Sequence, residues 1–171
     1  MLPIENVSEL VSILENAGEL KRVKSQVDSD LEIAEILRRV MYANGPAVLF
    51  ENVRGFDMPV LGNAFGSVKR LQLALEMEDF TQIGQRIADM TKMEIPSGFL
   101  NKIRKLPELS KMGEVFPKLE NSGPVTEIVE TSPSFNKIPI LKTWHKDAGR
   151  FITLGLVATK HPETGVRNLG V

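Results

Sequence analysis

One asparagine near the end of the sequence has the most constrained setting of all the residues that could do chemistry. Asn168 lies in a short apolar segment, residues 166–171, that follows the sequence HPETG at 161–165. Proline suits the second position of a turn, and glycine suits a left-handed position that closes it. The flanking segments are therefore expected to pair as a β-hairpin. A buried amide among strand residues needs a polar partner, which makes Asn168 a candidate ligand residue.

The two histidines give weaker indications of function. His161 precedes Pro162 at the tip of the expected turn, where an exposed side chain is predicted. His145 follows Trp144 and could touch a ligand, although a lone histidine in a loop is more often structural or solvated. The histidines and carboxylates have no spacing typical of a closed zinc site. Neither histidine has a motif partner that would activate a serine or threonine nucleophile.

The glycines do not form a nucleotide-binding fingerprint. Their spacing matches neither G-x-G-x-x-G nor a P-loop, so they are interpreted as turn and cap residues. The segment GNAFG at 62–66 lies between a predicted strand and a predicted helix. It could hold an anion at the helix N-terminus, but a plain strand-to-helix turn is favoured.

The elements that must position these residues begin with a predicted α/β layer. Asn6 with Glu9, and Ser29 with Glu32, have the spacing of capping boxes, and Ser67 can cap a third helix. Helices are predicted at 7–17, 31–44, 67–75 and 80–90, and strands at 19–23, 47–53 and 59–61. This order, with a near-continuous apolar strand at 47–53, is typical of an α/β layer.

The character of the chain changes after about residue 92. Prolines and glycines interrupt residues 92–123, as in a connecting segment. Short strands are then predicted at 126–130, 138–142, 151–160 and 166–171. We therefore place a domain boundary at residue 120, with an α/β domain and its connecting segment at 1–120 and a β part at 121–171. Four short strands are few for a barrel or sandwich, so the β part is expected to be incomplete.

Composition excludes several classes of protein. Lysine and arginine (21) nearly balance aspartate and glutamate (22), so the whole-chain charge does not favour nucleic-acid binding. The absence of cysteine excludes disulfides and thiolate chemistry. No secretory signal and no apolar run of about 20 residues is visible. We expect a soluble, cytoplasmic protein without a membrane span.

Strings along nearly the whole chain resemble the UbiD family of decarboxylases, and they occur in family order. They are AGEL at 17–20, LEIAEI at 31–36, GPA at 45–47, LFENV at 49–53, MPVLGN at 58–63, LKTW at 141–144, DAG at 147–149, FITL at 151–154, HPETG at 161–165 and RNLG at 167–170. The resemblance implies an α/β (α+β) N-terminal domain followed by the first strands of an FMN-binding split β-barrel.

The resemblance also implies a cofactor set and three site residues. UbiD-like enzymes use prenylated FMN, Mn²⁺ (or Mg²⁺) and often K⁺. Asn168 matches the family's metal-ligating asparagine, and a neutral amide oxygen suits these metals. Val171 matches the first backbone position that cradles the cofactor, and Thr153 is a weaker match to a cofactor contact. The family's metal-binding histidine and glutamate, and its Glu-Arg-Glu acid–base set, would lie beyond Val171.

The implied activity is the reversible decarboxylation of aromatic or α,β-unsaturated carboxylic acids. One metal ligand cannot hold the ion, so we expect the N-terminal portion or a split subunit of such an enzyme, inactive alone and with no catalytic residue of its own. The implied partners are a complementary C-terminal subunit or further copies, the small-molecule acid, and a flavin prenyltransferase that supplies the cofactor. The alternative is a stand-alone, non-catalytic assembly or flavin-binding module that pairs through its unfinished strand edge.

Overall fold

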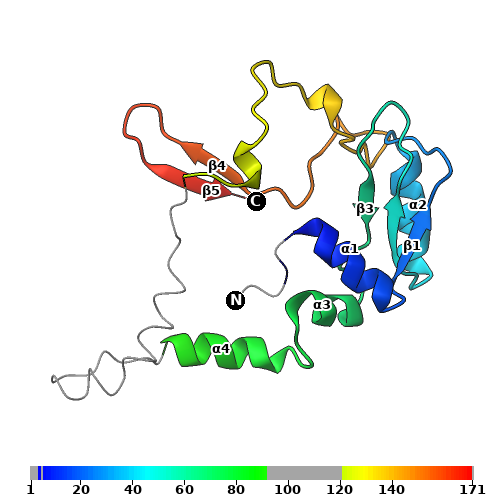
Figure 1. Cartoon of the computed structure of the whole chain (residues 1–171), viewed down its shortest axis with the longest axis horizontal. Helices are drawn as coiled ribbons and strands as arrows, with labels where there is room; N and C mark the ends of the chain where they lie inside the picture. Colours follow the sequence, from blue (N-terminus) through cyan, green and yellow to red (C-terminus); the bar gives the residue numbers. More distant parts are fainter. Residues whose placement is uncertain (1–3, 5, 92–120, 171) are drawn as a thin grey trace. The chain divides into compact units, whose positions relative to one another are not determined.

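The computed structural model describes residue 4 and residues 6–91 and 121–170 of the 171-residue chain (Figure 1). The helices are α1 (Val7–Asn16), α2 (Glu32–Tyr42), α3 (Val68–Leu75) and α4 (Thr81–Thr91), with short 3₁₀ turns η1 (Pro124–Thr126) and η2 (Phe135–Lys137). The strands are β1 (Leu20–Val23), β2 (Ala47–Phe50), β3 (Val60–Gly62), β4 (Val157–Lys160) and β5 (Arg167–Gly170). By contacts, Met1–Glu78 with Ser134–Val171 form one unit and Asp79–Pro133 another.

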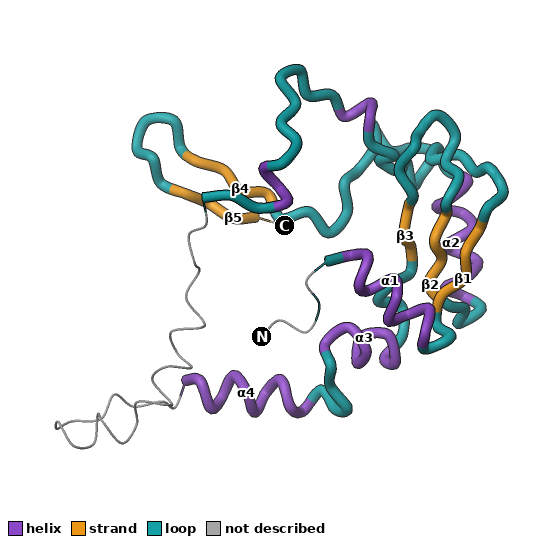
Figure 2. The backbone as a smooth tube through the Cα atoms, in the orientation of Figure 1, coloured by secondary structure: helices purple, strands orange, loops and turns teal. Residues whose placement is uncertain are grey.

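The first three strands form a mixed sheet in the order β1–β2–β3 (Figure 2). β1 and β2 run parallel, with Leu20 opposite Ala47, and α2 supplies the crossover between them. β3 then returns antiparallel to β2, with Val60 opposite Phe50. The predicted order of helices and strands in this region, and the mixed α/β class, are confirmed.

The central strand β2 is buried on both faces because helices cover both sides of the sheet. Val48 and Phe50 belong to a core cluster against which residues of α2 pack. Ala47 belongs to a second cluster, built with Leu10 and Leu14 of α1 and with α3. The sheet and the helices on its two faces together make three layers. This whole unit, residues 6–78, is called the α/β layer below.

Two of the three predicted helix caps are confirmed. The Asn6 side chain accepts a hydrogen bond from the Glu9 amide (2.9 Å), and that of Ser67 accepts one from the Arg70 amide (3.2 Å). The cap predicted at Ser29 is wrong. The helix begins at Glu32 after Leu31, which has a φ of 66°. The Glu32 amide donates to Asp30 O (2.8 Å) and not to the Ser29 hydroxyl, while the Glu32 carboxylate accepts from the Asp28 amide.

The β part contains the predicted hairpin but fewer strands than predicted. β4 and β5 pair antiparallel, with Thr159 opposite Asn168. Residues 161–165 turn the chain between them, and Gly165 has the expected left-handed φ of 70°. The His161 amide donates to Val166 O (2.8 Å) to close the turn.

The remaining strand predictions need correction. No strand forms at 126–130, where Pro124 starts a 3₁₀ turn that the Thr126 hydroxyl closes onto Gly123 O. The strand predicted at 151–160 is interrupted at residues 153–154, because Leu154 takes a φ of 60°. The strand predicted at 138–142 reduces to isolated bridges at Leu141 and Lys142. Among the described residues, no helix is long and apolar enough to span a bilayer.

Candidate functional site

Residues 138–151, hereafter the docking segment, attach the β part to the α/β layer through main-chain hydrogen bonds. The Lys142 amide donates to Ser29 O (3.1 Å), and the Leu31 amide donates to Lys142 O (3.0 Å). Leu141 packs against the core cluster that contains Phe50. The Phe151 amide donates to Leu141 O (3.0 Å), which folds the segment back on itself. The two sides of this contact are far apart in the sequence.

Arg150 adds side-chain bonds to the same contact. One guanidinium nitrogen, Nη1, donates to the Ser29 hydroxyl at 2.7 Å and to Ile140 O at 2.8 Å. The other, Nη2, lies 3.7 Å from the Asp30 carboxylate. The Ser29 residue is 1% exposed, so its hydroxyl meets the guanidinium inside the protein. Sequence reasoning missed this pair, since no local pattern links residues 29 and 150.

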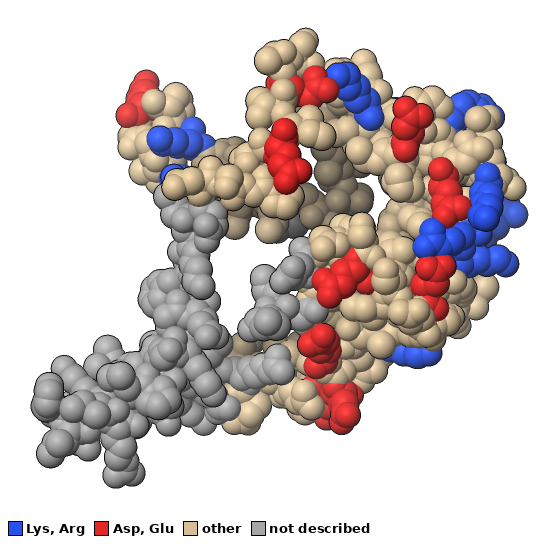
Figure 3. All heavy atoms as spheres, viewed as in Figure 1, with Lys and Arg blue, Asp and Glu red and all other residues tan. Residues whose placement is uncertain are grey.

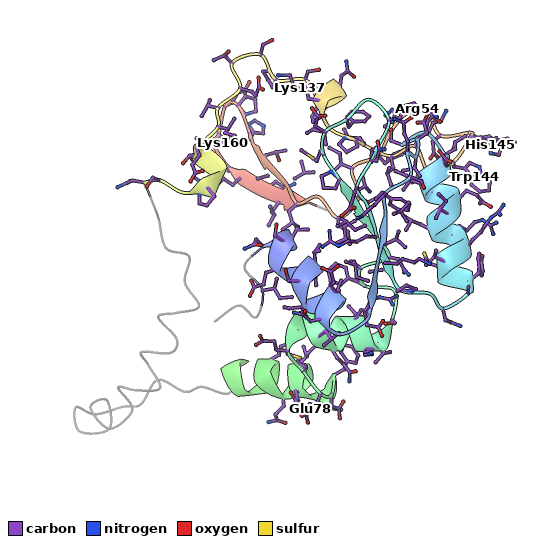
Figure 4. The ribbon with its side chains drawn as sticks, turned by 45° about the vertical axis from the view of Figure 1, so that its right-hand side comes forward. Arg54, Glu78, Lys137, Trp144, His145 and Lys160 are labelled. Atoms are coloured by element: carbon purple, nitrogen blue, oxygen red, sulfur yellow. The ribbon has the colours of Figure 1, made fainter. Side chains whose placement is uncertain are left out.

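A groove of about 530 Å³ runs between α2 and the docking segment. Trp144 and His145 lie beside α2 at this groove (Figure 4), with ring centroids 5.2 Å apart. The Asp147 carboxylate shapes their turn by accepting from the Trp144 amide (2.9 Å) and the Thr143 hydroxyl (3.1 Å). The lining residues are Leu31, Ala34, Glu35, Leu37, Arg38, Met41, Leu141, Thr143, Trp144, His145 and Thr153.

The carboxylate in the groove is already engaged. Glu35 accepts from Arg38 Nε and from Arg39 Nε, both at 2.7 Å. Hydrogen bonds from Arg38 and then from Arg39 lower the pKa of Glu35 to about 2. Glu35 is therefore ionised at neutral pH and cannot serve as a proton donor there. The carboxylate of the groove is thus committed to its two arginines, and the rest of the lining is largely apolar and aromatic, with His145 beside Trp144.

Two of the three predicted site residues, Thr153 and Asn168, are among the described residues. Thr153 lines the groove with Trp144 and His145. Asn168 lies on β5, exposed, and is not among the groove residues. Val171 lies outside the described residues. The metal and cofactor roles assigned to these residues therefore stay predictions.

The surroundings of Asn168 are apolar and open. Four hydrophobic side chains of the hairpin and its approach are more than half exposed: Leu156, Val157, Val166 and Leu169. The described residues contain no group of three or more histidine, cysteine, aspartate or glutamate side chains that could hold a metal. The side-chain oxygen of an asparagine is of the kind that Mn²⁺ or Mg²⁺ accepts, but a single ligand does not hold a divalent ion. The remaining ligands would have to come from elsewhere.

The histidines differ in their settings. His145 stands at the groove, as a ligand-contacting residue would. His161 is exposed, as predicted, and its Nδ1 accepts from the amides of Glu163 and Thr164, both at 3.2 Å. His161 is therefore a turn residue.

The turn at residues 62–66 has a structural role. The Asn63 side-chain Nδ2 donates to Gly45 O (3.1 Å) and Pro46 O (3.0 Å) and ties the turn to the preceding loop. The buried Arg70 guanidinium donates to the Glu19 carboxylate (3.0 Å). Lys69 and then Arg70 lower the pKa of Glu19, so the positive charge beside this turn is already paired. The favoured interpretation, a plain strand-to-helix turn, accounts for these contacts without an anion.

The surface charges are mixed as well. Arg22 on β1 pairs with Glu15 and with Glu51, both at 2.6 Å. Figure 3 shows basic and acidic side chains next to each other along this edge of the α/β layer. This arrangement does not form a basic face of the kind that binds nucleic acid.

Two family models match the chain. Residues 11–88 match the 3-octaprenyl-4-hydroxybenzoate carboxy-lyase N-terminal domain, and residues 118–171 match the Rift-related domain of the same family. A curated protein of Aquifex aeolicus is 43% identical over 169 residues, which are 97% of this chain and 35% of that protein. One of Archaeoglobus fulgidus is 42% identical over 98% of this chain and 34% of that protein. The chain thus spans about a third of the length of the curated relatives it matches.

Solved structures share the fold. The UbiD-class enzyme HmfF of Pelotomaculum thermopropionicum, in an evolved dimeric form with prFMN, matches with a TM-score of 0.67 and 25% identity, over 95% of this chain and 34% of that chain. The vanillic acid decarboxylase ShVdcCD of Sedimentibacter hydroxybenzoicus, in its open form, has the same fold. It matches with a TM-score of 0.69 and 22% identity, over 98% of this chain and 33% of that chain.

Proposed function

Because the chain belongs to the UbiD family of carboxy-lyases, we propose that it forms the N-terminal portion or a split subunit of a UbiD-like decarboxylase. The enzyme acts reversibly on aromatic or α,β-unsaturated carboxylic acids with prenylated FMN and a divalent metal. The coverage of about a third of each relative supports a portion of the machinery rather than all of it. The prFMN bound to HmfF supports the choice of cofactor.

The exposure of the β4–β5 hairpin carries the proposal. All four residues of β4 are exposed, as are Arg167, Asn168 and Leu169 of β5. A two-stranded sheet is marginally stable by itself, and apolar side chains such as Leu169 favour a covering partner. In the proposed enzyme, β4 and β5 are the first strands of a flavin-binding split β-barrel, and the partner polypeptide supplies the rest.

Each predicted site residue has one role in that assembly. Asn168 gives an amide oxygen to Mn²⁺ or Mg²⁺, while Thr153 and the main chain of Val171 contact the cofactor. When bound, prenylated FMN supplies the electrophilic chemistry that loss of CO₂ requires. The chain's own residues orient the cofactor and contribute one metal ligand. The acid–base residues come from the complementary part, so the chain alone is inactive.

A titration of the 171-residue chain with prenylated FMN and Mn²⁺ tests this proposal. We expect tight binding and turnover only when a C-terminal UbiD-like polypeptide is supplied in trans. Asn168→Ala should abolish metal-dependent binding in the assembled pair, and Asn136→Ala, at an exposed asparagine in η2, should leave binding unchanged. Turnover by the 171 residues alone would contradict the proposal.

The same exposed hairpin also supports one alternative function. Unpaired strand edges favour addition of a strand from another chain, so β4 or β5 could pair with a second copy in a non-catalytic assembly module. Sedimentation equilibrium distinguishes the two. Concentration-dependent dimers that Leu169→Lys disrupts favour the module, whereas a monomer at high concentration excludes it.

A further inference from the structure

We propose that Arg150 is a positioning residue, whose guanidinium fixes the docking segment against Ser29 and Asp30 and thereby sets the groove wall that carries Trp144, His145 and Thr153. The proposal concerns how the α/β layer controls the β part. It rests on the proposed function only in its consequence for cofactor binding, because Thr153 is a proposed cofactor contact.

The hydrogen bonds of Arg150 reach both sides of the contact. Nη1 donates to Ser29 Oγ in the α/β layer and to Ile140 O in the docking segment itself. The second bond closes the loop from Ile140 to Arg150, and the first attaches that closed loop to the layer. A single guanidinium thus fixes the internal shape of the segment and its attachment.

The buried end of the contact is the hydroxyl. Ser29 is 1% exposed, while the Arg150 side chain is 41% exposed. Removal of the guanidinium would leave the Ser29 hydroxyl without this donor inside the protein, which is the costly half of a broken hydrogen bond. The planar fork of arginine reaches several acceptors at once, and a lysine ammonium at this position would not reproduce that geometry.

The main-chain hydrogen bonds beside Arg150 allow the opening of this contact to be measured directly. The amides of Leu31 and Lys142 donate across it, to Lys142 O and Ser29 O respectively. Both amides become exchangeable when the segment lifts from the layer, even while the layer stays folded. Such local opening is measurable by native-state hydrogen exchange.

The first experiment measures hydrogen exchange of the Leu31 and Lys142 amides in the 171-residue chain. We expect Arg150→Gln to speed both about tenfold, the size of one charge-assisted hydrogen bond. In Arg150→Lys and Ser29→Ala, the exchange rates of these two amides should lie between those of Arg150→Gln and those of the unchanged protein. Trp144, the only tryptophan in the sequence, should become more accessible to acrylamide in Arg150→Gln.

The matched control is Arg39→Gln, which removes an arginine from α2 whose ion pair with Glu35 lies outside this contact. Its Leu31 and Lys142 amides should exchange as in the unchanged protein. Unchanged exchange in Arg150→Gln, or equal acceleration in Arg39→Gln, would overturn the proposal. Because Arg150 is not in either core cluster, all four variants should remain folded in the absence of urea, which far-UV circular dichroism checks.

The second experiment uses the chain assembled with its C-terminal partner. Arg150→Gln should weaken prenylated FMN binding about tenfold, while kcat at saturating cofactor stays within about twofold. An unchanged cofactor affinity would overturn the link between the docking segment and Thr153. If the unchanged chain fails to bind cofactor in any assembly, the proposed function fails, and the exchange result still decides the role of Arg150.

Discussion

Strands β2 and β5 have the same length but opposite surroundings. All four residues of β2 are buried, since α2 covers one face of the sheet and α1 with α3 covers the other. In β5, Arg167, Asn168 and Leu169 are exposed. The difference shows that a strand is buried only where other elements of the protein cover its two faces. The α/β layer buries its central strand within this chain, whereas both strands of the hairpin are largely exposed.

The largest contrast is expected between Phe50 of β2 and Leu169 of β5, two large apolar side chains. Phe50 is fully buried, so Phe50→Ala should lower the free energy of unfolding by about 3–5 kcal/mol. Leu169 is 65% exposed, and Leu169→Ala should change it by less than about 0.5 kcal/mol. Urea unfolding followed by far-UV circular dichroism measures both. Comparable losses would show that the hairpin is packed in solution.

Two strand-end glycines sharpen the comparison. A Cβ at Gly62 would collide with the Leu37 side chain of α2, so Gly62→Ala should destabilise the layer by about 1–3 kcal/mol. A Cβ at Gly170 meets nothing described within 4 Å, and Gly170→Ala should be neutral to within about 0.5 kcal/mol. Thermal unfolding of the two variants gives the answer. A Gly170 variant as unstable as the Gly62 variant would mean that β5 has close neighbours in solution.

Acid should weaken the layer through Glu19. Lys69 and Arg70 lower the pKa of Glu19 from its ordinary value of 4.5, so the unfolded chain binds a proton more readily than the folded one. The ionised Glu19 makes its full contribution to the free energy of unfolding above pH 4.5. This contribution is lost as the pH falls through the lower pKa of Glu19 in the folded protein. Glu19→Gln should flatten the decline of stability below pH 4.5, and Lys69→Met should flatten it in part. If stability declines with falling pH as steeply in Glu19→Gln as in the unchanged protein, this ion pair does not contribute to acid sensitivity.

The smallest change in stability is expected for a substitution at Asn168, the proposed metal ligand. Asn168 is exposed on the hairpin, so Asn168→Ala should change the stability of the isolated chain by less than about 0.5 kcal/mol. Its proposed contribution appears only as metal-dependent cofactor binding in the assembled enzyme. A loss above about 1 kcal/mol in urea unfolding would assign the amide to the hairpin fold instead.

Local sequence patterns predicted the α/β layer and the hairpin turn well. Asn6 and Ser67 cap helices as their spacing indicates, and the apolar segment predicted as a strand at 47–53 contains the buried strand Ala47–Phe50. The His161–Gly165 turn follows from its proline and glycine. In the caps and the turn the deciding interactions lie within a few residues, so the nearby sequence contains them.

The failures lie where distant residues or unusual dihedral angles decide. Leu154 interrupts a predicted strand by adopting a left-handed φ that leucine rarely takes. Ser29 has the right spacing for a cap, but its hydroxyl instead accepts from Arg150. The metal role of Asn168 and the cofactor role of Thr153 came from a family resemblance and stay predictions, although Thr153 lines a groove. Periodicity and propensity contain no information about such pairings.

The hydrogen bond between Ser29 and Arg150 can form only late during synthesis of the chain. It spans 121 residues, so its formation closes a very long loop, whose entropic cost grows only logarithmically with length. The layer ends at residue 78 and can fold while the docking segment is still inside the ribosome. Residues 138–151 would then bind to a finished surface, as a ligand joined to its receptor by a tether. Synthesis of the N-terminal part is thus expected to produce its own docking site before the segment that fills it.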